Sequence, residues 1–167
     1  MVEISISVLT VSDRSFRKER EDLSGPLLID KIETLGWRLI DYDIVPDEIK
    51  SIQEKLIVWS DSIKPNLIIT TGGTGFSPRD LTPEATIKII TRNAPGLSEA
   101  MRASGIQTAP HAILSRGVTG IRNESIIVNL PGSPKGAIEN LTAIENVLPH
   151  AVKLLLNRPE AENEHRS

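Results

Sequence analysis

Short apolar runs alternate along the chain with segments in which apolar residues recur at helical spacing. The runs are rich in Ile, Val and Leu, which is typical of buried strands, and they lie at residues 4–11, 37–45, 67–69 and 125–130. Helices are predicted at residues 22–36, 47–59, 83–90, 97–106 and 137–156. Strands that alternate with helices in this way predict an α/β fold in which a mostly parallel sheet is covered on both faces.

One strand is expected to run against the others. The apolar residues at 112–118 are interpreted as a further strand, and residues 121–124 have the composition of a hairpin turn into the strand at 125–130. That connection is too short for a crossover, so the two strands must be antiparallel. The predicted sheet is therefore mixed, mostly parallel, with one antiparallel strand.

Length and composition are those of an ordinary globular domain. The 167 residues are 39% hydrophobic and 25% charged, which fits one domain with its own core. We expect a single domain at residues 1–157 with its core at 4–156, followed by a polar tail at 158–167. Aromatic residues are only 3% of the chain, so the core must be built from aliphatic side chains.

Charge, cysteine content and hydropathy exclude several classes of function. The net charge is −3, and no basic run is paired with aromatic residues, so we expect no nucleic-acid partner. The chain has no cysteine, which excludes disulfides, thiolate zinc sites and cysteine nucleophiles. The first residues lack the pattern of a secretory signal, and no apolar run approaches a membrane span. We therefore expect a cytoplasmic protein with no membrane partner.

The most informative stretch is a glycine-rich turn, Gly72-Gly73-Thr74-Gly75, which closely follows the apolar run at 67–69. Glycines let the backbone approach a ligand closely, and successive N–H groups can hold anionic oxygens. The hydroxyls of Thr71 and Thr74 can add donors. The turn matches neither the Walker A motif nor the dinucleotide fingerprint. A tight strand-to-helix turn is the simpler interpretation, but the whole stretch favours an anion or nucleotide site.

The turn leads through a polar loop into a helix. Arg79 and Asp80 lie in the loop, and the helix is predicted to be capped by Thr82, with Pro83 at its first position. Asp80 comes too early in the sequence to be the cap of that helix. Because Asp80 has no obvious role as a helix cap, the presence of Arg79 and Asp80 strengthens the interpretation of this stretch as an anion or nucleotide site.

Acidic residues lie beyond three of the predicted strands. Asp13 follows the first strand, Asp47 follows the second, and Asp80 lies beyond the glycine-rich turn. The carboxyl ends of parallel strands meet at one edge of a sheet, where ligands bind. Acids at that edge can hold Mg²⁺, which neutralises phosphate charge in phosphoryl or nucleotidyl transfer. The simpler alternatives are a turn residue for Asp13 and a helix N-cap for Asp47.

A second glycine-containing loop, residues 131–136, follows the last strand. Gly132, Ser133 and Lys135 lie there at the start of a helix, where an anion is stabilised; a capped helix with a solvated lysine is the alternative. Other arginines can pair with phosphate or with local acids, and the histidines are interpreted as structural or surface residues. The residues in question are Arg14, Arg79, Arg116, His111 and His150.

The order of these motifs resembles the MogA/gephyrin G-domain family of molybdenum-cofactor proteins. The residues that carry the resemblance are Ser12-Asp13-Arg14, Pro46-Asp47, Thr70-Thr71-Gly72-Gly73-Thr74-Gly75, Arg79-Asp80-Leu81-Thr82-Pro83-Glu84-Ala85-Thr86, Pro95-Gly96-Leu97, Leu114-Ser115-Arg116 and Asn129-Leu130-Pro131-Gly132-Ser133-Pro134-Lys135. The resemblance covers roughly residues 4–156. It implies a three-layer α/β/α sandwich around the mixed sheet, the MoaB/Mog fold, and a homotrimer.

The resemblance also implies the activity of a molybdopterin adenylyltransferase. Such an enzyme transfers AMP from Mg-ATP to the terminal phosphate of molybdopterin and releases pyrophosphate. The family pattern implies that Asp47 and Asp80 are catalytic and hold Mg²⁺, and that residues 71–75 hold the nucleotide. It associates the loop of Ser133 with the pterin and places Asp13 near the site. The product would pass to a molybdate-insertion enzyme.

A non-catalytic molybdopterin-binding or scaffolding protein of the MoaB type is the alternative. Members of that type that look inactive tend to lack the Arg-Asp-x-Thr-Pro arrangement, which residues 79–83 retain. The resemblance therefore favours an active enzyme. It leaves open whether molybdenum or tungsten is finally served.

Overall fold

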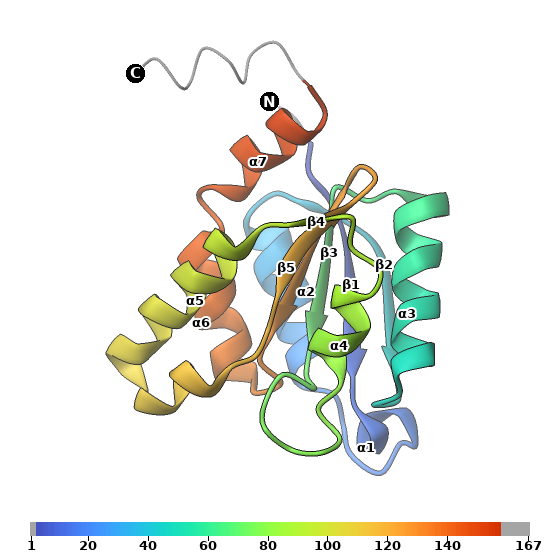
Figure 1. Ribbon diagram of the computed structural model, residues 1–167, viewed down its shortest axis with the longest axis vertical. Helices are drawn as coiled ribbons and strands as arrows, with labels where there is room; N and C mark the ends of the chain where they lie inside the picture. The colour runs from blue at the N-terminus through green and yellow to red at the C-terminus, as the bar shows by residue number, and fades with distance from the viewer. Residues whose placement is uncertain (1–2, 158–167) are drawn as a thin grey trace.

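The centre of the molecule is a six-stranded sheet (Figure 1), in a computed structural model that describes residues 3–157. The strands are β1 (Ser5–Val11), β2 (Arg38–Val45), β3 (Leu67–Thr71), β4 (Arg92–Asn93), β5 (Thr119–Arg122) and β6 (Ser125–Leu130), in the order β2-β1-β3-β6-β5-β4. β2, β1, β3 and β6 are parallel, β5 pairs antiparallel with β6, and β4 pairs antiparallel with β5. β5 alone therefore runs against the other strands, which confirms the predicted mixed, mostly parallel sheet.

Helices cover both faces of the sheet (Figure 1). They are α1 (Asp13–Phe16), α2 (Ser24–Thr34), α3 (Ile49–Val58), α4 (Thr82–Ile87), α5 (Pro95–Thr108), α6 (Pro134–Ile144) and α7 (Leu148–Leu155), with a π-helical turn (Trp59–Ile63) after α3 and a 3-10 helix (Pro110–Leu114) after α5. α3 and α4 pack on one face, whereas α2, α5, α6 and α7 pack on the other. These layers confirm the α/β/α sandwich.

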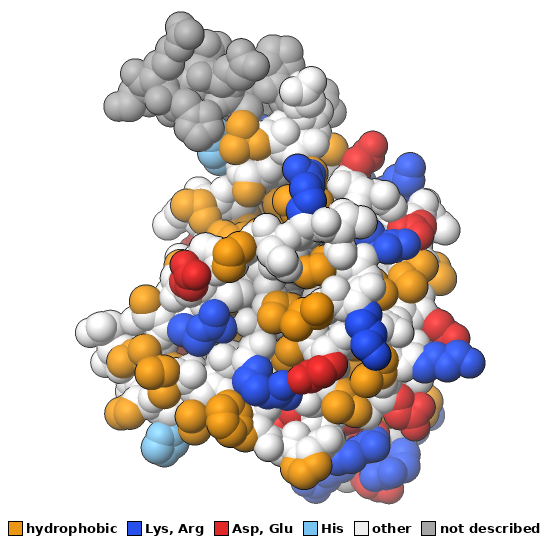
Figure 2. Space-filling model, in the orientation of Figure 1, with side chains coloured by type: hydrophobic (Ala, Val, Ile, Leu, Met, Phe, Trp, Pro, Cys, Tyr) orange, Lys and Arg blue, Asp and Glu red, His pale blue; other side chains and the backbone are white. Residues whose placement is uncertain are grey.

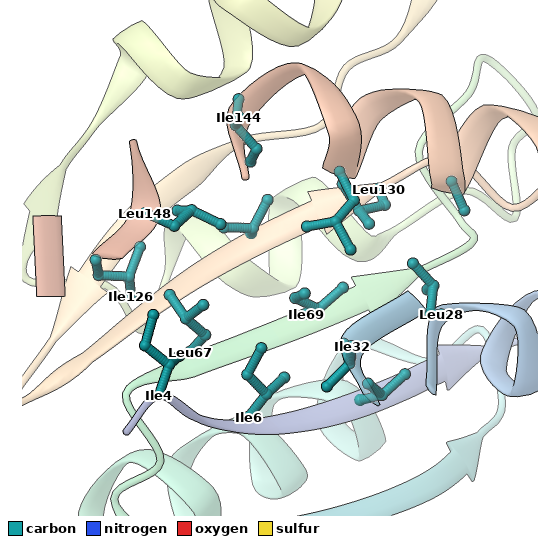
Figure 3. Packing of buried hydrophobic residues seen from close by; sticks show 14 of the residues in the cluster. Ile4, Ile6, Leu28, Ile32, Leu67, Ile69, Ile126, Leu130, Ile144 and Leu148 are labelled. Atoms are coloured by element: carbon teal, nitrogen blue, oxygen red, sulfur yellow. The ribbon is translucent and has the colours of Figure 1, made fainter. Parts of the chain in front are cut away.

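Both faces of the central strands are buried, which explains why apolar residues occur at neighbouring positions in these strands instead of only at every second one. In β1, Ile6 and Val8 belong to the cluster under α2 and α6, while Leu9 and Val11 belong to the cluster under α3 and α4. Figure 3 shows the first cluster, in which aliphatic side chains from the strands meet those of α2 and α6. The core is built from aliphatic side chains, as the low aromatic content requires.

The predicted strand at residues 112–118 is wrong. Residues Pro110–Leu114 form the 3-10 helix, and β5 begins only at Thr119. Ile113 and Leu114 are 63% and 48% exposed, so this apolar run lies on the surface rather than in the sheet. β4 was not predicted, because its two residues are exposed and polar and give no apolar signal.

Charged side chains gather at the end of the molecule at which the parallel strands terminate. Figure 2 shows Lys and Arg side chains gathered with acidic ones at the lower end, where α1 lies and where β1 and β3 point in Figure 1. No helix within residues 3–157 is both long and apolar enough to cross a membrane. The predicted polar tail at 158–167 lies outside the described residues.

Candidate functional site

The loops that follow β3 and β6 touch at one edge of the sheet. We call them the first glycine loop (residues 72–80, after β3) and the second glycine loop (residues 131–136, after β6). The Gly72 N–H donates to Leu130 O at 3.1 Å, and the Thr71 hydroxyl donates to Pro131 O at 2.7 Å. The topology therefore brings together two segments that the sequence predicted at the same edge.

The first glycine loop begins with a backbone that glycine adopts more readily than other residues. Gly72 and Gly73 have φ angles of +104° and +65°. A Cβ on Gly72 would clash with Val11 O, and one on Gly73 would clash with Thr82 Oγ1. The turn is therefore packed closely against β1 and α4, which explains the need for glycine at both positions.

Three backbone N–H groups of this turn are available to a ligand. The N–H of Gly72 and the hydroxyl of Thr71 are already used in bonds to the end of β6 and the second glycine loop. Within residues 3–157, no hydrogen bond uses the N–H groups of Gly73, Thr74 or Gly75. Successive free N–H groups of this kind form a site for an anion. The predicted donor role of the Thr71 hydroxyl is replaced by a structural one.

Thr82 does not cap α4, contrary to the prediction. It is the first residue of the helix, after Leu81, and Pro83 follows it instead of starting the helix. The Thr82 hydroxyl donates to Gly72 O at 2.8 Å, and its N–H donates to Gly73 O at 3.1 Å. The buried Thr82 therefore fastens the glycine turn to α4.

Asp13 and Asp47 are joined by two reciprocal hydrogen bonds between the ends of β1 and β2. The N–H of Asp13 donates to Asp47 Oδ2 at 2.7 Å, and the N–H of Asp47 donates to Asp13 Oδ1 at 3.0 Å. Arg79 donates to Asp13 Oδ2, from Nε at 3.0 Å and from Nη2 at 2.6 Å. Burial alone would raise the pKa of Asp13, but the bonds from Arg79 and Asp47 outweigh it, so this pKa lies below its ordinary value. Both oxygens of Asp13 are thus occupied.

Asp47 is not the predicted helix cap. α3 begins at Ile49 after Glu48, and the Asp47 carboxylate reaches across to Asp13 instead. Burial raises the pKa of Asp47; the hydrogen bond from Asp13 lowers it in part, and the negative charges of Asp13 and Asp80 raise it further. Burial is therefore the main reason that the charged form of Asp47 is disfavoured, and the neighbouring carboxylates add to it although the charge of Arg79 opposes them.

Asp80 ends the first glycine loop in a tight turn. Its Oδ2 accepts the N–H of Ser77 at 2.9 Å, and its own N–H donates to Ser77 O at 2.9 Å. Its carbonyl accepts a hydrogen bond from Arg116 Nη2 at 2.6 Å. The carboxylate is therefore oriented by the loop backbone, and its structural role is a turn within the loop.

Among the cavities beside the first glycine loop are two that share a wall. The larger, of about 500 Å³, is bounded by the loop, the end of α5, the 3-10 helix and the start of α6; the smaller, of about 380 Å³, is bounded by the loop, the end of β1 and residues 20–24. The shared wall consists of Gly73, Asp80, Gly132 and Ser133. Asp47 lines the smaller cavity, and Lys135 lines the larger one. The arrangement suits two ligands that meet at the wall.

Ser133 and Lys135 line the larger cavity and also make structural contacts. Ser133 Oγ accepts the N–H of Gly136 at 3.2 Å and caps α6, which confirms the cap. Lys135 pairs with Glu139 at 3.7 Å, and its side chain is 83% exposed. An ion pair this long and exposed holds the lysine weakly, so its ammonium group stays accessible to an anion in the cavity.

Asp47 and Asp80 each have a carboxylate oxygen left for a cation. Within residues 3–157, no hydrogen bond ends on Oδ1 of either carboxylate. The same residues contain no group of three or more His, Cys, Asp or Glu side chains arranged to hold a metal ion. Carboxylate oxygens suit Mg²⁺, which usually takes one or two carboxylates and fills its other positions with water and substrate phosphates. The donor set and the clustered negative charge fit that cation.

The hydrogen bonds that fix the second glycine loop left little sign in the sequence. Asp22, predicted only to open a helix, accepts the N–H of Ser24 at 3.1 Å and the hydroxyls of Thr10 and Tyr42 at 2.5 Å each. The Ser24 hydroxyl then donates to Gly132 O at 2.7 Å. Thr10 and Tyr42 lie in strands that contain several other polar residues, so the sequence did not single them out.

The remaining charged candidates are dispersed. Arg14 is an exposed residue of α1, and Arg116 pairs with Glu84 of α4. His111 is exposed at the larger cavity, whereas His150 is partly buried in α7. The two histidines therefore do not form a common site.

Comparison with known proteins assigns the chain to a family. A family profile described as "Probable molybdopterin binding domain" matches residues 7–150. The molybdopterin adenylyltransferase of Helicobacter pylori is 42% identical over 166 residues, which cover 98% of this chain and 94% of that protein. The molybdenum cofactor synthesis protein cinnamon of Drosophila melanogaster is 43% identical over 156 residues, which cover 93% of this chain and 26% of that protein.

The fold agrees with the same assignment. The crystal structure of the molybdopterin biosynthesis enzyme MoaB from Thermus thermophilus has a TM-score of 0.88 and 46% sequence identity, and the match covers 93% of this chain and 98% of that one. The chain spans about a quarter of the length of cinnamon but nearly all of the bacterial proteins. The chain therefore belongs to the family of molybdopterin-binding domains that includes MogA and MoaB.

Proposed function

We propose that this chain is a molybdopterin adenylyltransferase. An oxygen of the terminal phosphate of molybdopterin attacks the α-phosphorus of ATP. The new O–P bond forms as the bond between the α-phosphorus and the oxygen bridging to the β-phosphorus breaks, which gives adenylyl-molybdopterin and pyrophosphate. The nucleophile and the leaving group both belong to the substrates, so the protein has to supply alignment and charge compensation.

The observation that carries the proposal is the pair of cavities joined at one wall. Two polyanionic substrates must meet with their phosphates in contact, and both cavities open onto Gly73 and Asp80. The free N–H groups of residues 73–75 are suited to phosphate oxygens, and Lys135 adds a cation in the larger cavity. The 42% identity to the H. pylori adenylyltransferase supports the same activity.

Mg²⁺ is the proposed cofactor, with Asp47 and Asp80 as its protein ligands. Bound Mg²⁺ would neutralise part of the phosphate charge in the transition state. Asp13 does not compete for the ion, because its oxygens bond Arg79 and the Asp47 backbone. Its part in the reaction is to fix the position of Asp47.

We propose further that the protein is a cytoplasmic homotrimer that passes its product to a molybdate-insertion enzyme. The support is family membership, since relatives are named as molybdenum-cofactor synthesis proteins. Light scattering on the purified chain tests the assembly. A mass close to three times the 18.3 kDa of one chain is expected, and the mass of a monomer would contradict it.

The activity is tested by assaying formation of adenylyl-molybdopterin from Mg-ATP with wild type and Asp80→Asn. The asparagine still accepts the Ser77 N–H, so we expect an unchanged melting temperature and a kcat lower by about 10²- to 10³-fold, as for loss of one charge-stabilising group. Asp30→Asn, on an exposed position of α2, is the control and should keep full activity. Tight pterin binding by wild type with no turnover would refute the enzyme and favour a non-catalytic MoaB-type protein.

A further inference from the structure

Arg116, between the 3-10 helix and β5, contacts the first glycine loop and α4 at four points. Its N–H donates to Thr74 O at 2.9 Å, its Nε to Gly75 O at 2.7 Å, and its Nη2 to Asp80 O at 2.6 Å. Its Nη1 pairs with Glu84 in the first turn of α4. One side chain therefore bridges the two ends of the segment from residue 75 to residue 80.

Between these two ends the loop is exposed. Residues 76–79 are all exposed, and the side chain of Phe76 reaches 69%. Arg79 also ties this segment to Asp13, but its side chain bonds that one carboxylate alone. The Arg116 side chain bonds two carbonyl groups of the loop in addition to Glu84. Arg116 is therefore the firmer of the two attachments.

The Arg116 backbone is itself held in place. Arg102 Nη1 donates to Ser115 O at 3.3 Å and to Gly117 O at 3.1 Å, on either side of Arg116. The three acceptors of the Arg116 side chain require three separate donor nitrogens in one plane, which a guanidinium has and an ammonium lacks. Lysine at this position would keep the charge but not the geometry.

We propose that Arg116 is a positioning residue for adenylyl transfer. It fixes the distance between Gly75 and Asp80, and thereby the free N–H groups of the first glycine loop relative to the Asp80 carboxylate. This inference rests on the proposed function, because it assigns the loop geometry to that reaction. A misplacement of about 1 Å costs up to about 10²-fold in rate. We therefore expect Arg116→Lys to lower kcat by about 10- to 100-fold, with a smaller change in KM for ATP.

The test compares Arg116→Lys with a matched control, Arg122→Lys. Arg122 binds Asp61 through two nitrogens and Ile89 O through the third, so it is a similar clamp away from both glycine loops. For each variant we would measure kcat, KM, melting temperature and hydrogen exchange at the hydrogen-bonded amides within residues 75–80, those of Ser77, Arg79 and Asp80. Faster exchange at these amides and a lower kcat are expected in Arg116→Lys alone, while both variants lose some thermal stability.

Two results would overturn the inference. One is unchanged exchange over residues 75–80 in Arg116→Lys; the other is an equal fall in kcat in both variants, which would indicate general destabilisation. If wild type itself forms no adenylyl-molybdopterin, the proposed function fails, and the exchange data still decide whether Arg116 orders the loop. If Arg116→Lys does not fold, Glu84→Ala removes one of the contacts and should raise the same exchange rates to a smaller extent; no rise would contradict the inference.

Discussion

Asp61 and Asp47 lie at opposite edges of the parallel strands, and their carboxylates are held in opposite ways. At the amino edge, Asp61 accepts hydrogen bonds from Arg122 at 2.8 and 2.7 Å and from the Asn123 side chain at 2.7 Å. The hydrogen bond from Arg122 is the main reason that the pKa of Asp61 is lowered. At the carboxyl edge, burial and neighbouring carboxylates raise the pKa of Asp47. The ionised form of Asp61 is stabilised by its partners, whereas that of Asp47 costs stability.

The difference teaches where a function resides in this fold. An acid that is fully paired needs nothing further, whereas an acid with a raised pKa beside other acids has a reason to bind a cation or a proton. Both Asp61 and Asp47 lie at the ends of the sheet, so position alone would not distinguish a structural acid from a functional one. The groups around each carboxylate distinguish them: Arg122 and Asn123 bond Asp61, whereas other carboxylates lie near Asp47.

The largest expected effect is on kcat, which should fall when Asp47 is changed but not when Asp61 is changed. Asp47→Asn keeps an oxygen for the Asp13 N–H but removes the charge. We expect kcat for adenylyl transfer to fall by about 10²- to 10³-fold, with a melting temperature equal to or above that of wild type. Asp61→Asn should do the opposite, with normal kcat and a lower melting temperature. Similar kinetics for the two variants would remove the distinction between the edges.

A smaller effect is expected from adding one methyl group to the first glycine loop. Gly73 has a φ of +65°, and a Cβ there would clash with Thr82 Oγ1 and lie 3.2 Å from Asp47 Oδ1. Gly73→Ala should cost about 1–2 kcal/mol of unfolding free energy from the left-handed backbone alone, and should also lower kcat because it displaces the loop. Denaturant unfolding and the turnover assay measure the two effects.

Gly36 provides the control for Gly73. It has a similar φ of +72° but nothing within 4 Å of an added Cβ, and it follows α2, away from the cavities. Gly36→Ala should therefore carry the backbone cost and leave kcat unchanged. A loss of activity in Gly36→Ala would mean that stability, and not loop geometry, limits the reaction.

The periodicity of the sequence predicted the sheet and its faces because burial on both sides leaves continuous apolar runs. It failed at residues 110–114, where Ile113 and Leu114 are apolar but exposed. Hydrophobicity indicates which residues can be buried, but the packing of the whole chain decides which residues are. Because the apolar residues 112–114 were assigned to a strand, the strand was predicted before residue 119, where β5 begins.

For the site, the chain topology predicted that Asp13, Asp47 and the first glycine loop lie at one edge. It could not predict which polar groups are used internally, such as the Thr71 hydroxyl bonded to Pro131 O. Arg116 is the clearest case, since its acceptor Gly75 lies 41 positions away in the sequence. No periodic pattern encodes a contact of that length.

The smallest expected effect concerns the pH dependence of stability, and it tests the comparison of the edges without any substrate. The folded pKa of Asp47 is raised above 3.8, so its ionisation destabilises the fold; this penalty is present above the folded pKa and vanishes as the pH falls below 3.8. Asp47→Asn should therefore gain stability over wild type as the pH rises from about 3 to about 7. The folded pKa of Asp61 is lowered, so Asp61→Asn should lose stability over the same range, because the favourable ionised form is missing. Urea unfolding across that range measures both differences, and two curves of the same sign would show that the charge at Asp47 is compensated within the fold after all.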